Sequence, residues 1–183
     1  MSKFDEIATD CWLTPDPQLE LISRLWPGGI DLDPFHDPES NVEARIRFDI
    51  RRGENAYTKR WGEPGTRVFA NGPYSGSNPQ QTLERAARYG ANGRHILNLC
   101  PAAPGSNYWI AHGGPWFDAV AWLGRLPFRA GRDLYDAQGK LTAKKGETVN
   151  GNRTEIAMLY TGPHVRAFRA IWSGAGFPVQ AIG

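Results

Sequence analysis

The stretch that decides the fold of this chain is Arg67-Val68-Phe69-Ala70-Asn71-Gly72-Pro73-Tyr74-Ser75. Its apolar run stops at an amide, a glycine, a proline and an aromatic ring, and the residues from Asn78 onward carry the signals of a starting helix. Asn-Gly is also a hairpin-turn dipeptide, but no second strand follows it. We therefore predict a strand over 67–70, a loop, and a helix over 79–89 with Asn78 as its N-cap and Gly90 at its end.

The loop at 71–74 is a candidate functional site, because open α/β sheets bind ligands in the loops that follow their strands. Its residue types suit a planar base that carries an exocyclic amine. Asn71, Pro73 and Tyr74 have the spacing that an enzyme needs to hold such a base. From these residues alone, an ordinary connecting loop is an equally open interpretation.

The composition is that of an ordinary globular domain. The chain has 183 residues, of which 40% are hydrophobic and 22% charged, enough for one domain with its own core. No apolar run approaches the ~20 residues of a membrane span, and the start lacks a secretory signal. Cys11 and Cys100 have no metal or redox spacing, which fits a reducing cytoplasm. A net charge of +2 is compatible with nucleic acid without requiring it.

Short strands alternate with helices along the chain. This alternation predicts a single α/β domain over 1–183, with a mostly parallel sheet and helices on both faces. Two long segments have no regular pattern: 49–66, and the basic, glycine-rich 124–153. Residues 1–11 are expected to be a loose lead-in. The other expected elements are a helix capped by Thr14 with Pro15 at its first position, helices at 40–48, 106–112 and 164–172, and strands at 30–34, 95–100, 119–123, 155–160 and 177–182.

Acidic side chains gather at 31–39, after the first strand. Asp33 has two interpretations: a carboxylate that meets a hydroxyl or ammonium group of a ligand, or a cap for the Asp-Pro turn. A metal site for a metal-dependent nuclease is a further hypothesis, with the candidate ligands Asp31, Asp33, His36, Asp37 and Glu39. The segment fails the calcium-loop pattern, and the histidines of the chain lack zinc spacing. We therefore expect a solvated acidic loop and no metal.

Three ordered pieces of the sequence resemble the small phage-type DNA N6-adenine methyltransferases, the phage Dam-like family. The pieces are Asp10-Cys11-Trp12-Leu13-Thr14-Pro15, then Asp31-Leu32-Asp33-Pro34 leading through Asn41-Val42-Glu43-Ala44, and finally Asn71-Gly72-Pro73-Tyr74-Ser75. Their order and spacing also match, and the resemblance covers about residues 10–130 well.

The resemblance implies a Rossmann-like class I fold that binds S-adenosylmethionine and methylates N6 of adenine in DNA. It makes 71–74 the catalytic loop and places Thr14 and Pro15 near the methionine end of the cofactor. It also makes 49–66 and 124–153 candidate DNA-recognition insertions, and implies the host cytoplasm for a phage-encoded chain, with no membrane partner and no prediction of oligomeric state. The residues assigned to catalysis are Asn71, Gly72, Pro73 and Tyr74, and those assigned to the cofactor are Trp12, Thr14, Pro15, Asp31, Asp33, Pro34 and Asn41.

Two departures from the family pattern keep a second hypothesis open. The family loop usually reads Asn-Pro-Pro-Tyr or Asp-Pro-Pro-Tyr, whereas Gly72 replaces the first proline here. Because the glycine backbone is more flexible, the direction of the carbonyl at this position is less restricted. The usual acidic, glycine-containing segment is replaced by Arg51-Arg52-Gly53-Glu54-Asn55. The alternative is therefore a cofactor- or DNA-binding module of the same fold that has lost catalysis, in which Gly72→Pro would restore activity.

Overall fold

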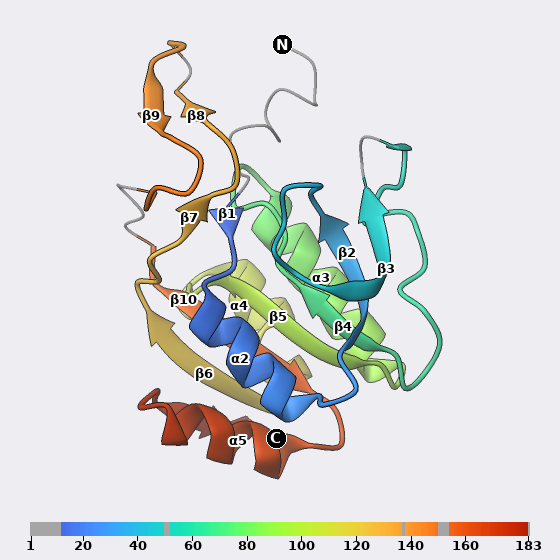
Figure 1. The fold of residues 1–183 in the computed structure, drawn as a ribbon. Helices are drawn as coiled ribbons and strands as arrows, with labels where there is room; N and C mark the ends of the chain where they lie inside the picture. Colours follow the sequence, from blue (N-terminus) through green and yellow to red (C-terminus); the bar gives the residue numbers. More distant parts are fainter. Residues whose placement is uncertain (1–11, 50–51, 137, 150–153, 183) are drawn as a thin grey trace.

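The computed structural model describes residues 12–49, 52–136, 138–149 and 154–182, so the predicted lead-in at 1–11 lies outside the described residues (Figure 1). The elements are β1 (Trp12–Leu13), α2 (Asp16–Leu25), β2 (Ile30–His36), β3 (Ala44–Asp49), β4 (Arg67–Ala70), α3 (Asn78–Ala91), β5 (His95–Pro101), α4 (Asn107–His112), η2 (Gly114–Trp116), β6 (Ala119–Gly124), β7 (Arg129–Ala130), β8 (Leu134–Tyr135), β9 (Leu141–Ala143), β10 (Ile156–Thr161), α5 (Val165–Gly174) and β11 (Val179–Ala181). Within these ranges, none of the helices combines the length and the apolar character that crossing a membrane requires.

The central sheet has seven strands in the order β11-β6-β10-β5-β4-β2-β3. Strands β5, β4, β2 and β3 are mutually parallel. Strand β10 is antiparallel to both of its neighbours, so β6 runs in the same direction as β5, and the edge strand β11 is antiparallel to β6. The α/β class is confirmed, but the sheet is mixed, since half of its neighbouring pairs are antiparallel. A strand pattern in a sequence carries no direction, which is why these pairs were missed.

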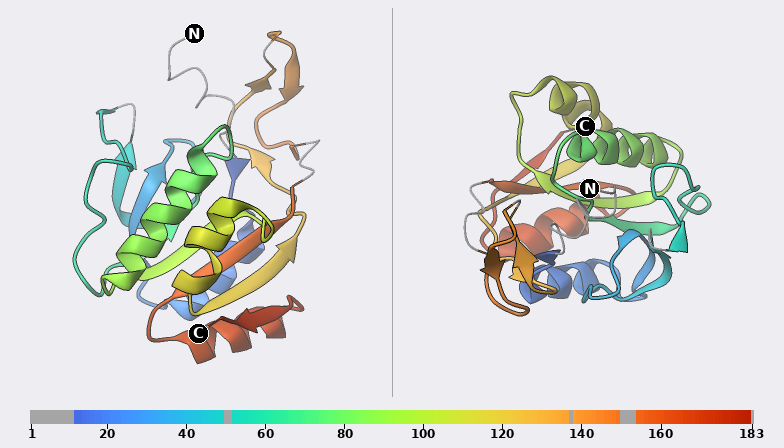
Figure 2. Two further views of the ribbon diagram at one scale, coloured as in Figure 1. Left: turned by 180° about the vertical axis from the view of Figure 1, so that it is seen from behind. Right: turned by 90° about the horizontal axis from the view of Figure 1, so that it is seen from above.

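Helices cover both faces of this sheet, α2 and α5 on one and α3 and α4 on the other (Figure 2). Each helix turns apolar side chains toward the strands, and in α2 these are Leu21, Ile22 and Leu25. Large aromatic side chains fill much of the interior, because each removes a large apolar area from water. The largest fully buried ones are Trp26, Trp61 and Trp172.

The helix predicted at 40–48 is wrong, because residues 44–49 form the edge strand β3 beside β2 (Figure 1). These residues alternate apolar and charged side chains, which is the period of a strand. Residues 37–43 return the chain to the start of β3 without the crossover helix that usually joins parallel neighbours. Val42, 4% exposed, packs this return against the same core as α2.

The loop and helix after β4 confirm the strand–loop–helix prediction, with shifted helix ends. The N-cap of α3 is Ser77 instead of Asn78, and the helix continues through Gly90. Gly90 faces Thr161 of β10, and a Cβ at this glycine would collide with that side chain. The glycine with a left-handed backbone after the helix is Gly93, at φ +80°. The remaining predicted elements are confirmed with ends shifted by no more than two residues.

Strand β2 is tied to β4 at its amino end by an ion pair. The Arg67 guanidinium donates through Nε to Asp31 Oδ2 and through Nη2 to Oδ1, both at 2.8 Å, and the Arg67 backbone N–H donates to Oδ2 at 3.0 Å. Arg45 of β3 adds a contact to Asp31 at 3.1 Å. The bonds from Arg67 hold the pKa of the Asp31 carboxyl below its usual range.

Asp31→Asn is expected to lower the free energy of unfolding by about 1 kcal/mol at pH 7. Because the pKa of Asp31 is lower in the folded chain than in the unfolded one, its stabilisation is complete above the unfolded value, near 3.8, and is lost as pH falls through the folded value. Urea unfolding of both proteins between pH 7 and pH 3 measures the difference. A difference that does not shrink toward pH 3 would contradict this role.

Candidate functional site

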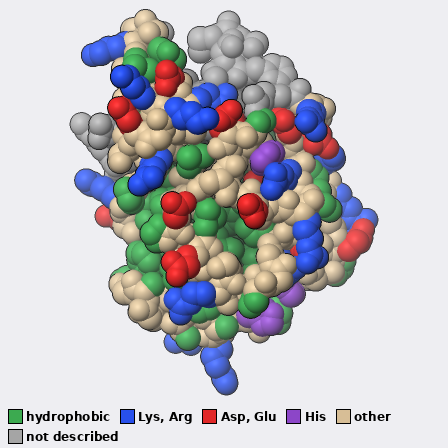
Figure 3. Space-filling view, in the orientation of Figure 1, with side chains coloured by type: hydrophobic (Ala, Val, Ile, Leu, Met, Phe, Trp, Pro, Cys, Tyr) green, Lys and Arg blue, Asp and Glu red, His purple; other side chains and the backbone are tan. Residues whose placement is uncertain are grey.

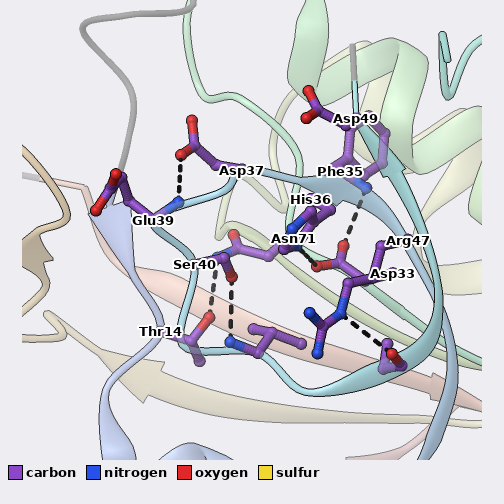
Figure 4. A network of polar contacts seen from close by, with 12 residues as sticks. Thr14, Asp33, Phe35, His36, Asp37, Glu39, Ser40, Arg47, Asp49 and Asn71 are labelled. Atoms are coloured by element: carbon purple, nitrogen blue, oxygen red, sulfur yellow. Dashed lines mark hydrogen bonds and ion pairs between the residues drawn. The ribbon is translucent and has the colours of Figure 1, made fainter. Parts of the chain in front are cut away.

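The candidate site lies at the carboxyl ends of β2 and β4, two neighbouring parallel strands. Figure 4 shows Asp33 and His36 of β2 close to Asn71, the residue that follows β4, with Thr14 in the same network. Adjacent parallel strands end at the same edge of a sheet, and this brings together segments that are distant in the sequence. The loops that follow these two strands therefore meet in the structure.

Both the nitrogen and the oxygen of the Asn71 side-chain amide form hydrogen bonds within the protein. Its Nδ2 donates to the Thr14 hydroxyl at 3.2 Å, and its Oδ1 accepts from the Tyr74 hydroxyl at 3.1 Å. Thr14 is 2% exposed, and the N-cap of α2 is Pro15, so the predicted capping role of Thr14 is wrong. An amide oxygen accepts two hydrogen bonds, which leaves the Asn71 oxygen able to accept one more donor.

Three aromatic rings stand beside this amide. Tyr74 lies edge-on to Trp12 of β1 and to Phe128, with ring centroids 5.8 and 6.0 Å apart, and Trp12 lies 5.6 Å from Phe128. Edge-to-face contacts of this kind are favourable beyond the apolar area that they bury. The rings therefore fix the Tyr74 hydroxyl toward Asn71 and give the site an apolar wall.

Asp33 closes the corner at the end of β2. Its Oδ1 accepts the Phe35 backbone N–H at 3.0 Å, which stabilises the turn through the buried Pro34. Its Oδ2 lies 3.7 Å from His36 Nδ1, and this ring nitrogen is buried without a hydrogen-bond partner among the described residues. Asp33 is 4% exposed, so a carboxylate and an imidazole share a largely buried position at the site.

The side chain of Asn41, in the return segment 37–43, forms hydrogen bonds at the start of α2. Its Nδ2 donates to the Thr14 carbonyl at 2.8 Å and to Asp16 Oδ1 at 3.2 Å. Its Oδ1 is buried and has no hydrogen-bond partner in the described part of the chain. A buried amide oxygen without a donor is costly, so this atom marks a place where a ligand donor is favoured.

Asp31 does not join the predicted cofactor residues. It lies near the amino end of β2, and the ion pair with Arg67 occupies both of its carboxylate oxygens. Asp33 is only two residues later but lies toward the carboxyl end, beside His36. The two aspartates of the Asp-Leu-Asp-Pro piece thus have separate positions.

The acidic loop after β2 contacts the basic segment 124–153. Asp37 pairs with Arg132, and Glu39 accepts from Lys145 Nζ at 2.7 Å. The bond from Lys145 holds the pKa of Glu39 below its usual range. No group of three or more His, Cys, Asp and Glu side chains is placed to hold a metal ion in the ranges that the structure describes. The positions of these carboxylates give the nuclease hypothesis no support.

Gly72 lies where α3 comes close to the loop. A Cβ at this position would be 2.5 Å from Thr82 Oγ1 and 3.1 Å from Thr82 Cγ2. Thr82 is 3% exposed, and its hydroxyl lies 3.1 Å from the Tyr57 hydroxyl. Glycine therefore makes room for this threonine. A proline at 72 brings the same Cβ, so Gly72→Pro alone does not test catalysis cleanly.

Three residues at the site were missed in the sequence. Asp49 ends β3 as the register partner of His36, and the alternation over 44–49 was the signal that could have found it. Phe128 and Thr82 have no signal in the sequence, because their relation to the loop depends on how distant elements pack.

The chain matches a model of a known protein family. A family model described as DNA N-6-adenine-methyltransferase (Dam) matches residues 1–173 of the 183-residue chain. A search among curated proteins and a search among solved structures returned no match. The matched range contains every residue described above at the site, from Trp12 to Phe128.

Gly72→Ala is expected to lower the free energy of unfolding by about 1–3 kcal/mol, because its Cβ overpacks the contact with Thr82. Thr82→Ala removes the atoms in the way, so the double variant should recover part of that loss. Urea unfolding of the two single variants and the double variant gives the coupling energy. Additive effects would show that the two positions do not share this space.

Proposed function

The chain belongs to the DNA N-6-adenine-methyltransferase (Dam) family, and from that premise we propose how its residues carry out the reaction. The substrate is DNA, and the reaction adds a methyl group to the N6 amine of adenine. The observation that carries our proposal is the Asn71 amide, oriented between the hydroxyls of Thr14 and Tyr74 at the carboxyl end of β4.

We infer that the sheet is a Rossmann-like class I methyltransferase sheet. Five of its seven strands, β3, β2, β4, β5 and β6, run in one direction, and β10 is inserted antiparallel between β5 and β6. The loop at 71–74 follows β4, a central strand of the parallel part. In such sheets ligands bind outside the carboxyl ends of the strands, which is where the site residues gather.

We propose S-adenosylmethionine as the methyl donor, bound at the carboxyl ends of β2 and β3. Its ammonium and ribose hydroxyls are hydrogen-bond donors, and its sulfur carries a positive charge. The site offers matching acceptors: the buried Asn41 Oδ1, which has no partner among the described residues, and the buried carboxylate of Asp33. The residues present therefore fit this cofactor.

The residues that we propose for cofactor binding are those that the structure brings to this edge. Asp31 is left out because Arg67 binds it at the other end of β2. Asp49 is added because a carboxylate at the end of a neighbouring strand binds ribose hydroxyls in doubly wound folds. The set is Trp12, Thr14, Pro15, Asp33, Pro34, Asn41 and Asp49.

The lone pair of an adenine N6 amine is delocalised into the ring, so the amine is a poor nucleophile. The free acceptor position of Asn71 Oδ1 and the carbonyl of Gly72 are proposed to accept its two hydrogens. These bonds draw the nitrogen toward tetrahedral geometry and localise its lone pair. S-adenosylmethionine, when bound, supplies an electrophilic methyl group, so the task of the protein is to position the nucleophile.

Tyr74 and Pro73 are proposed to place the base. The base must leave the DNA stack, which costs a few kcal/mol, and the half-buried Tyr74 ring offers a stacking surface beside Asn71. Pro73 restricts the backbone between the two. The apolar contacts of Tyr74 with Trp12 and Phe128 keep this surface in position before the base arrives.

The alternative of a module without catalysis was based on Gly72. The structure gives this glycine a packing reason, since a side chain there would overlap Thr82. Glycine in the loop is therefore compatible with an intact site. We rank the active methyltransferase above the module without catalysis.

Asn71→Ala is expected to lower the rate of methyl transfer about 100-fold or more, because the transition state loses an oriented hydrogen-bond acceptor. The assay incubates DNA with methyl-labelled S-adenosylmethionine and counts label in N6-methyladenine after digestion to nucleosides. Calorimetric binding of S-adenosylmethionine serves as the control and should be unchanged. Transfer at the wild-type rate by the variant would overturn the role of Asn71.

Thr14→Val is expected to reduce the turnover rate about three- to tenfold, with Thr14→Ser restoring most of it. The hydroxyl of Thr14 orients the Asn71 amide, and one neutral hydrogen bond contributes about 1 kcal/mol. Valine has the shape of threonine without the acceptor, and serine keeps the acceptor. If serine and valine were equally impaired, Thr14 would act through packing and not through this bond.

A further inference from the structure

We propose that residues 129–136 and 138–149, the DNA arm, are the surface that holds duplex DNA against the catalytic loop. This inference rests on the proposed function for its substrate, but its test is independent of catalysis. The sequence left two candidates for a DNA-recognition segment, 49–66 and 124–153. Their surroundings in the structure separate the two candidates.

The described part of the first candidate, 52–66, is packed into the domain. Trp61 is fully buried, donates its indole N–H to the Ala56 carbonyl at 2.9 Å, and stacks on Tyr89 of α3 with ring centroids 5.3 Å apart. Its cations are also matched within the segment, since Lys59 pairs with Glu54 at 2.6 Å and Arg60 with Glu63. This segment therefore covers part of the hydrophobic core beside α3.

The DNA arm instead projects beyond the sheet. Figure 1 shows β8 and β9 rising above β7 and β1, to the left of β2 and β3 in this view, and Figure 3 shows several Lys and Arg side chains in that region. The hairpin has a small core of its own, formed by Ala130, Leu134 and Ala143. It therefore has a defined shape with little support from the main sheet.

The base of the DNA arm is fixed to the site. Strand β7 pairs with β1, where Ala130 is the register partner of Trp12. Trp12 in turn contacts Tyr74, whose hydroxyl bonds Asn71. The ion pairs of Arg132 and Lys145 with the acidic loop hold the opposite side. DNA bound along the arm is thereby held at a set position relative to the catalytic loop.

An apolar pair is exposed on the DNA arm. Tyr135 and Leu141 are register partners across β8 and β9, and they are 49% and 39% exposed. Two large apolar side chains facing water side by side are costly for a free surface. Next to cations, an aromatic ring and an aliphatic side chain are suited to base and sugar contacts, while the cations contact phosphate.

The charge of this region fits a polyanion. Residues 124–153 contain seven Lys and Arg against three Asp and Glu, in a chain whose net charge is only +2, so the rest of the chain is net acidic. The acidic loop occupies Arg132 and Lys145. Lys140 and Lys144 are exposed and form no ion pair with any residue that the structure describes. We therefore assign these two lysines to phosphates.

The test measures DNA affinity by fluorescence anisotropy over a series of salt concentrations, with a labelled duplex. Tyr135→Ala with Leu141→Ala should weaken binding about tenfold. Lys140→Gln with Lys144→Gln should make the slope of log affinity against log salt shallower by roughly 2, because each phosphate contact contributes roughly 0.9. Calorimetric binding of S-adenosylmethionine should be unchanged in both.

Matched controls carry the same changes on surfaces away from the arm. Arg166→Gln with Arg169→Gln removes two exposed cations from α5, and Ile110→Ala removes a side chain that is 60% exposed on α4. These variants should retain nearly the wild-type affinity and slope. Equal losses in arm and control variants, or wild-type DNA binding by the arm variants, would overturn the inference. So would loss of cofactor binding in the arm variants, since it would show a structural role.

The inference and the proposed function fail in different ways. If the arm variants lose DNA binding while Asn71→Ala still transfers methyl groups, the DNA-binding role of the arm is supported and the catalytic role of Asn71 is rejected. If Asn71→Ala loses methyl transfer but the arm variants bind DNA normally, the catalytic role of Asn71 is supported and the DNA-binding role of the arm is rejected.

Discussion

The hydrogen bond between the Asn71 amide and the Thr14 hydroxyl joins the two parts of the chain on which the site depends. Thr14 stands between β1 and α2, and Asn71 stands at the end of β4. The neighbouring Thr14 carbonyl accepts from Asn41, which brings the return segment 37–43 to the same place. One residue thus orients the Asn71 amide, which we propose for catalysis, and the loop beside the proposed cofactor position, and a disturbance there would reach both.

The sequence predicted the parts of this site that depend on local chemistry. A strand, a Gly-Pro turn and a helix start occur within a few residues at 67–79, and the structure follows that order. The strand at 44–49 was missed because its alternating pattern was short and the preceding Ser40 and Asn41 are residue types that cap helices. Asp31 and Asp33 looked equivalent, because only the direction and register of β2 show that one faces Arg67 and the other His36.

Electrostatics gives the acidic loop a role different from the one that its composition suggests. Carboxylates at 31–39 had indicated a ligand-binding or solvated cluster, yet Asp37 and Glu39 each bind a cation of the DNA arm. This pairing reduces the number of cations left to face a polyanion, and it fixes the arm relative to β2. Ion pairs between the acidic loop and the arm therefore fix the positions of these two segments at the edge of the sheet. The number of charges in the sequence does not reveal this arrangement.

The overlap between position 72 and Thr82 has a consequence for how this chain can change over time. A proline at 72 is favourable only after the threonine has been replaced, and a threonine at 82 is favourable only after 72 has become glycine. The two substitutions therefore have a favoured order, because the intermediate with proline and threonine carries the overlap and the intermediate with glycine and a smaller residue at 82 does not. Lineages with glycine and lineages with proline in this loop would be separated by epistasis, even if both catalyse the same reaction.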